Sequence, residues 1–64
     1  MTSTEYMHIM EILNDMVQEE DDRCNRYYEL NPNDDETRRK ESSIYITALS
    51  IARRRIRDYQ LGRR

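Results

Sequence analysis

The stretch Leu30-Asn31-Pro32-Asn33-Asp34 contains the only proline of this 64-residue chain. Proline lacks a backbone N–H and disfavours helical geometry at the residue before it, so a helix is not expected to continue through Asn31. Asn33 is a residue type that caps helix starts, and Asp34 follows it at the positive end of the helix dipole. The stretch therefore predicts a loop at residues 31–33 between two helices.

The residues before this loop predict one long helix over about residues 3–30. Thr2 and Glu5 match the capping box at a helix start, and neither Gly nor Pro interrupts residues 3–30. The apolar residues from Tyr6 to Val17, with the exception of Met7, fall within an arc of about 160°. The pattern lapses over residues 18–23 and resumes at Cys24, where we expect a small buried hydrophobe.

The residues after the loop predict a second helix over about residues 34–61, with Gly62 as its stop signal. Its apolar positions are Ile44, Tyr45, Ile46, Ala48, Leu49, Ile51, Ala52, Ile56 and Tyr59. Two helices of similar length joined by a short loop fold back antiparallel. We therefore predict an all-α protein, an antiparallel two-helix hairpin that forms a single domain over residues 1–64.

Both predicted helices carry more apolar surface than one neighbour can cover. A helix that packs on one partner needs an apolar stripe of about 100°, and both stripes exceed this. The excess favours a homodimeric four-helix bundle, whereas in a monomer the stems of Arg and Lys side chains would cover the surplus. The residues expected at the dimer interface are Met10, Leu13, Val17, Ile44, Ile51 and Ile56.

Charge is divided between the two halves of the chain. Residues 1–36 hold eleven acids and two bases, and residues 37–64 hold nine bases and two acids. In an antiparallel hairpin, Glu11 and Asp15 should lie near the level of Arg53 and Arg54, so the two helices are expected to complement each other. The stretch 19–22 should lie opposite residues 42–45, which carry no positive charge, and is expected to remain uncompensated within the hairpin.

The uncompensated acidic stretch suggests a surface that binds another protein. Charged patches select partners and raise association rates, and tyrosines are enriched in interface cores. The predicted protein-binding residues are Glu19, Glu20, Asp21, Asp22, Tyr27 and Tyr28. The ordinary alternatives are a solvated helix face for the acids and interior packing for the tyrosines.

The arginine-rich C-terminal segment suggests a second hypothesis, an RNA- or DNA-binding hairpin dimer. Residues 53–64 contain six arginines against a single acid, and arginine suits bidentate recognition of phosphate. The residues that would contact nucleic acid are Arg53, Arg54, Arg57 and Arg64. The alternative is a solvated helix end.

Other function classes find no support in the sequence. There is no Gly-rich phosphate loop, nucleophile–base pair or Cys/His cluster, so we expect neither an enzyme nor a cofactor or metal. No apolar run reaches the length of a membrane span, and a single free cysteine without a targeting segment suits the cytoplasm. The sequence favours a small non-enzymatic protein-binding regulator or inhibitor, such as a phage or mobile-element accessory protein, whose target could be a nucleic-acid-handling enzyme.

Overall fold

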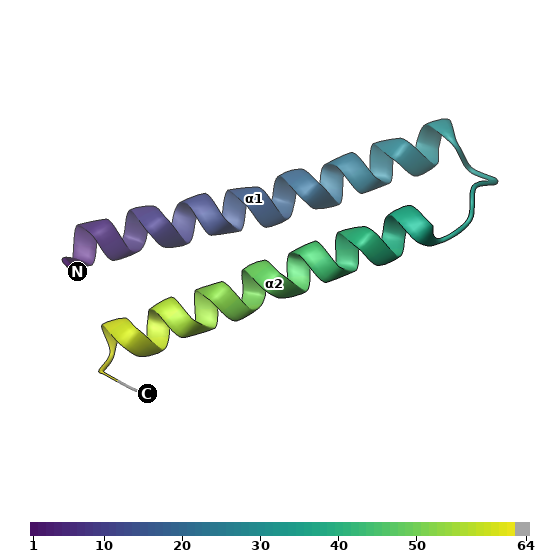
Figure 1. Cartoon of the computed structure of the whole chain (residues 1–64). Helices are drawn as coiled ribbons and strands as arrows, with labels where there is room; N and C mark the ends of the chain where they lie inside the picture. The colour runs from purple at the N-terminus through teal and green to yellow at the C-terminus, as the bar shows by residue number, and fades with distance from the viewer. Residues whose placement is uncertain (63–64) are drawn as a thin grey trace.

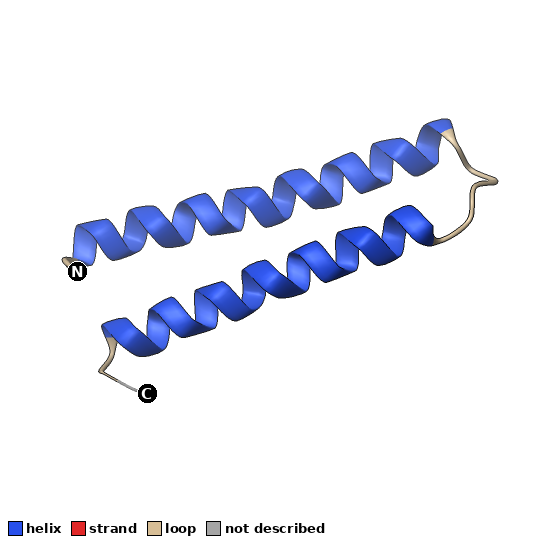
Figure 2. Cartoon of the chain, in the orientation of Figure 1, coloured by secondary structure: helices blue, strands red, loops and turns tan. Residues whose placement is uncertain are grey.

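The chain is a hairpin of two antiparallel helices joined by one loop (Figure 1). The computed structural model describes residues 1–62. Helix α1 spans Ser3–Leu30 and helix α2 spans Thr37–Gln60. The described residues contain helix and loop but no strand (Figure 2), so the predicted all-α hairpin is confirmed.

Both ends of α1 lie where the sequence predicts them. The Thr2 hydroxyl accepts a hydrogen bond from the Glu5 backbone N–H, and the Glu5 carboxylate accepts one from the Thr2 backbone N–H, both at 3.1 Å. These reciprocal bonds satisfy two N–H groups that have no partner within the helix. At the other end, the Asn31 backbone N–H donates to the Tyr27 carbonyl at 2.9 Å, and the helix stops before Pro32.

Helix α2 begins three residues later than predicted, and the prediction that Asn33 caps it is wrong. Two groups outside the helix satisfy its first N–H groups instead. The Asp35 carboxylate accepts from the Thr37 N–H at 3.0 Å, and the Tyr28 hydroxyl accepts from the Arg39 N–H at 3.1 Å. Because the Tyr28 cap comes from α1, the start of α2 depends on the approach of the two helices.

Tyr27 and Tyr28 hold the loop against the end of α1. The Tyr28 hydroxyl donates to the Asp35 carbonyl at 2.7 Å, and the Tyr27 hydroxyl donates to the Asp34 carboxylate. The two rings meet edge to face with centroids 5.2 Å apart, and the Arg39 guanidinium lies 4.6 Å from the centre of the Tyr28 ring. Such ring and cation–π contacts stabilise by about 0.5–1.5 kcal/mol each. The loop is therefore anchored by aromatic and polar contacts.

Two helices side by side make a slab that is one layer thick, and the slab has almost no interior. The Cα atoms extend over 47 × 21 × 8 Å. Only three described side chains are buried, and just one of them, Cys24, is hydrophobic. The predicted burial of Cys24 is confirmed. The other two, Glu20 and Ser42, are polar, so the centre of the helix contact near the loop is not a hydrophobic core.

One broad side of the slab carries an apolar surface that extends from the level of Tyr45 to the end far from the loop. Successive helical residues turn by about 100°, which places exposed and half-buried apolar side chains of both helices on the same side. We call this surface the apolar face; its members are Ile9, Ile12 and Met16 of α1 and Tyr45, Ala48, Ala52 and Tyr59 of α2. Ile44 and Ile51 continue it around the outer edge of α2, and both are at least half exposed.

The opposite broad side, which we call the polar face, is hollowed between the helices. One hollow is lined by Met10 of α1 and by Ser50 and three arginines of α2. A second, nearer the loop, is lined largely by polar side chains, among them Asp21, Asn25 and Arg39. Within residues 1–62, neither helix has the length and apolar character that crossing a membrane would require.

Candidate functional site

A partly buried ion pair joins the two helices near the loop. The Arg38 guanidinium donates a hydrogen bond to the Glu20 carboxylate at 2.7 Å, and only 11% of the Glu20 side chain is exposed. Arg23, one turn along α1, lies 3.8 Å from the same carboxylate. The hydrogen bond from Arg38 lowers the pKa of Glu20, partial burial opposes this, and the positive charges of Arg38 and Arg23 add to the lowering.

The expectation that residues 19–22 remain uncompensated is therefore wrong at Glu20. The amino-acid sequence predicts that this stretch lies opposite residues 42–45. The positive charge comes instead from Arg38, which lies one helical turn before them on α2. Glu19 is compensated only loosely, by Arg23 at 3.9 Å. Because arginine and glutamate side chains are long, an arginine one helical turn away on the facing helix can still neutralise the carboxylate of Glu20.

The four consecutive acids also do not form one patch. Glu20 points between the helices, Asp21 lines the second hollow of the polar face, and Glu19 and Asp22 lie on the outer edge of α1. The helical turn of about 100° per residue sends neighbours to different sides. Acids three and four positions apart share that outer edge instead, and we call this surface the acidic ridge; its members are Glu11, Asp15, Glu19 and Asp22.

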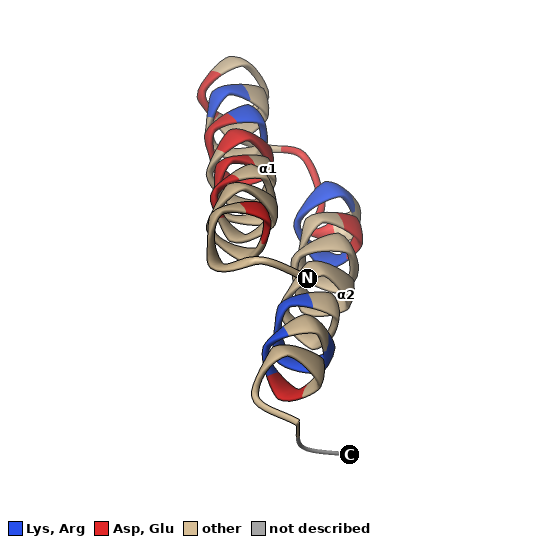
Figure 3. Cartoon of the chain, turned by 90° about the vertical axis from the view of Figure 1, so that its left-hand side faces the viewer, with Lys and Arg blue, Asp and Glu red and all other residues tan. Residues whose placement is uncertain are grey.

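Figure 3 shows the acidic positions following α1 and the basic positions concentrated on α2. The expected pairing of Glu11 and Asp15 with Arg53 and Arg54 is absent from residues 1–62. Arg53 instead donates hydrogen bonds to Asn14 across the hairpin and to Ser50 on its own helix. The ridge acids are all exposed, so this edge of the molecule is free to meet a basic surface.

Tyr27 and Tyr28 were predicted to bind a protein partner, and the structure places both at the loop. Their hydroxyl groups are engaged with Asp34 and Asp35, and the bond to Asp34 raises the pKa of Tyr27. Both rings are half-buried. Both tyrosines therefore have a structural role, because they hold the loop against α1. A partner would reach only the part of each ring that remains exposed.

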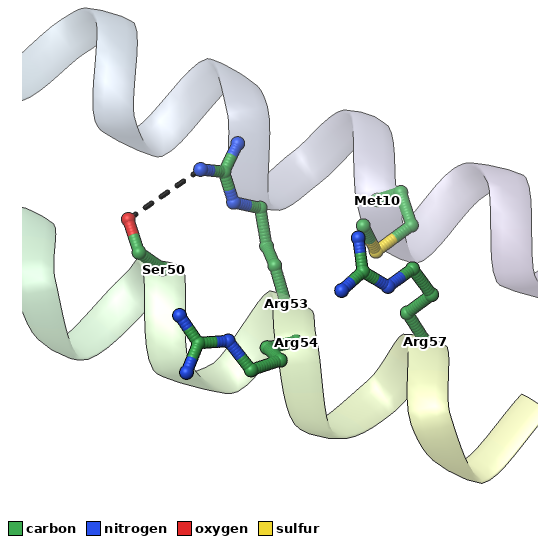
Figure 4. Close-up of a pocket in the computed structure, with 5 residues that line it drawn as sticks. All are labelled: Met10, Ser50, Arg53, Arg54 and Arg57. Atoms are coloured by element: carbon green, nitrogen blue, oxygen red, sulfur yellow. Dashed lines mark hydrogen bonds between the residues drawn. The ribbon is translucent and has the colours of Figure 1, made fainter. Parts of the chain in front are cut away.

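The structure brings three of the four predicted nucleic-acid contacts together. Arg53, Arg54 and Arg57 line a hollow of about 420 Å³ with Met10 and Ser50, which we call the arginine cleft (Figure 4). Arg64 lies outside the described residues. Sequence reasoning missed Asn14 and Ser50, which hold Arg53 in place, because their spacing becomes meaningful only once the two helices are aligned.

The six residues predicted for the dimer interface are distributed over the molecule. Leu13, Val17 and Ile56 are half-buried along the line where α1 and α2 meet, and Met10 lines the arginine cleft. Ile44 and Ile51 are exposed on α2. Ile12, which was not singled out from the sequence, is 58% exposed on the apolar face, so it offers more uncovered surface than the α1 residues that were.

Residues 1–62 contain no group of three or more His, Cys, Asp or Glu side chains placed to hold a metal ion. Comparison with known proteins found no match to the chain among protein-family models, curated proteins or solved structures.

Removing the charge of Glu20 should lower stability in a pH-dependent way. In the folded protein its pKa lies below the ordinary value of 4.5, so the pair stabilises the fold above that pH. The contribution is lost as the pH falls through the lower, folded-state pKa. Glu20→Gln should therefore cost about 1–2 kcal/mol near neutral pH, and this loss should shrink as the pH falls below 4.5, measured by urea unfolding.

Glu19→Gln is the matched control, because it removes the same charge from an exposed neighbour whose ion pair with Arg23 spans 3.9 Å. Surface pairs of this kind contribute at most about 1 kcal/mol. Equal losses in the two variants, or a loss for Glu20→Gln that persists in acid, would show that the Glu20–Arg38 pair does not hold the hairpin.

Proposed function

We propose that the chain is a small non-enzymatic protein-binding regulator that works as a homodimeric four-helix bundle. The observation that carries the proposal is the uncovered apolar face on a molecule with almost no interior of its own. Ile12, Ile44 and Ile51 are each at least half exposed, although they stand in helices that are otherwise rich in charge. Burying a fully exposed isoleucine stabilises by about 1.5–3 kcal/mol, so a partner that covers this face gains substantially.

A second copy of the chain is the partner that fits the apolar face best. Two slabs packed face to face give four helices around one interior, which is the architecture that two-helix hairpins commonly adopt. Ala48 and Ala52 are small and lie in the middle of the face, so two backbones can approach closely there. The loop half of the same side carries Glu20, Arg23 and Arg38, and these charges suit the rim of an interface.

The acidic ridge is the surface that we propose for partner recognition. It lies on the outer edge of α1, away from both the contact with α2 and the apolar face, so pairing of two chains leaves it accessible. Four exposed carboxylates at intervals of three and four residues make this edge mainly negative, although Arg23 and Arg26 lie beside Glu19 and Asp22. Such an edge favours a protein with a basic groove, including one that otherwise handles nucleic acid, and contributes mainly to association rate and selectivity.

The pairing predicts that Ile12→Glu converts the dimer into a monomer. A carboxylate on the apolar face would be buried against the second chain without a partner, at a cost of several kcal/mol per dimer. Sedimentation equilibrium at micromolar concentration measures the mass directly. The wild-type chain should sediment as a dimer and the variant as a monomer.

Met7→Glu provides a matched control for this experiment. Met7 is 59% exposed and Ile12 is 58% exposed, yet they lie on opposite sides of the slab, so only the Ile12 change should affect pairing. A monomeric wild-type chain would refute the dimer, and loss of pairing in both variants would show that the apolar face is not its interface.

The acidic ridge predicts that Asp15→Asn combined with Asp22→Asn weakens capture of a partner from an extract of the native host by tenfold or more. The matched control combines Asp21→Asn with Glu36→Gln, which removes the same charge from other surfaces. Quantitative mass spectrometry of the captured proteins is the readout. A partner that is retained equally by both double variants would exclude the ridge as the docking surface.

A further inference from the structure

We infer that the arginine cleft on the polar face is a binding site for the phosphate groups of a nucleic-acid backbone. The cleft lies on the side of the slab opposite the apolar face, so it stays open whether or not two chains pair. The inference therefore goes beyond the protein-binding function proposed above and can fail independently of it.

The cleft concentrates positive charge that the protein does not neutralise. Arg53, Arg54 and Arg57 line it together with a thioether and a hydroxyl, and no carboxylate takes part. Among residues 1–62, none of these three arginines forms an ion pair. Three guanidinium groups within little more than one helical turn repel one another, so an anion that enters the cleft is stabilised by all three.

The three arginines have distinct positions in the cleft. Arg53 is half-buried and fixed, because it donates to Asn14 of α1 and to Ser50 at 3.4 Å. Arg54 and Arg57 are exposed, and Arg57 lies beside Met10 (Figure 4). No hydrogen bond within the described residues occupies the donors of Arg54 or Arg57, so their planar forks can bind phosphate oxygens in the bidentate manner that arginine favours.

The polar face continues this basic surface along α2. Arg39 lines the second hollow together with Ser43 and Thr47, so small hydroxyl side chains lie between the arginines at its two ends. From Arg39 to Arg57 the helix rises by about 27 Å, which spans several nucleotides of an extended strand. Asp21 is the single acid that lines this second hollow.

A phosphate backbone fits this surface better than an acidic protein does. Protein interfaces depend on apolar and aromatic anchors that fill pockets, whereas the side chains lining the two hollows are mainly Arg, Ser, Thr and Asn. Hydroxyl, amide and guanidinium groups are the usual contacts to phosphate and sugar, and they carry no requirement for a particular base sequence. The affinity should fall as the salt concentration rises, because contacts between arginine and phosphate release counterions, and the acidic ridge on the far edge of α1 opposes binding.

The test is fluorescence anisotropy of two labelled probes, a short single-stranded RNA and a short duplex DNA, both of mixed sequence. The wild-type chain should bind at least one of them at low salt, and the probe preferred identifies which nucleic acid the cleft takes. Arg54→Gln combined with Arg57→Gln should weaken binding about tenfold per arginine and reduce the salt dependence by about two phosphate contacts.

Arg26→Gln combined with Lys40→Gln is the matched control, because it removes two exposed positive charges that lie outside the cleft. Its affinity should fall less than about threefold, as expected for a general charge effect. Neither double variant removes Arg53, which contacts Asn14, so helical content and sedimentation should match the wild type.

Three outcomes would overturn the inference. The first is the absence of binding to both probes at low salt, and the second is an equal loss of affinity in the two double variants. The third is competition by polyglutamate as effective as competition by unlabelled RNA or DNA, which would assign the cleft to an acidic protein.

Discussion

The structure depends on the fact that two helices can touch only along one line. Side chains on that line are partly covered, and everything beside it faces solvent. Near the loop the line is occupied by Glu20, Cys24 and Ser42, and the Glu20–Arg38 pair supplies the one ion pair between the helices among the described residues. A partly buried pair of this kind fixes which residues lie opposite each other more than it adds stability, because desolvation offsets part of its attraction.

The two halves of the hairpin consequently rely on different interactions. The loop half is closed by polar and aromatic contacts, in which Tyr28 caps α2 and Tyr27 holds Asp34. The terminal half has apolar side chains that one neighbouring helix cannot cover. This division separates the possible roles of the surfaces: the apolar face suits self-association, the outer edge of α1 carries acid, and the opposite broad side carries the arginine cleft.

The features that could be predicted from the sequence are the local ones. Pro32 marks the turn, and the Thr2–Glu5 capping box lies within one helical turn, so the bounds of α1 were correct. The start of α2 was only partly predictable in the same way, because Asp35 caps Thr37 locally but the cap of Arg39 comes from Tyr28, eleven residues away. The Glu20–Arg38 pair likewise depends on how the helices are aligned. The dispersal of residues 19–22 follows from helical geometry alone, because consecutive helical residues point to different sides of the helix.

The central claim is that the hairpin completes its hydrophobic interior only with a second copy of itself. Thermal unfolding followed by circular dichroism at a series of protein concentrations tests this most directly. If folding is coupled to pairing, the midpoint should rise by about 5 °C for each tenfold increase in concentration. A midpoint that stays constant over two tenfold steps, with a cooperative transition, would show that the single hairpin is stable alone and would contradict the account.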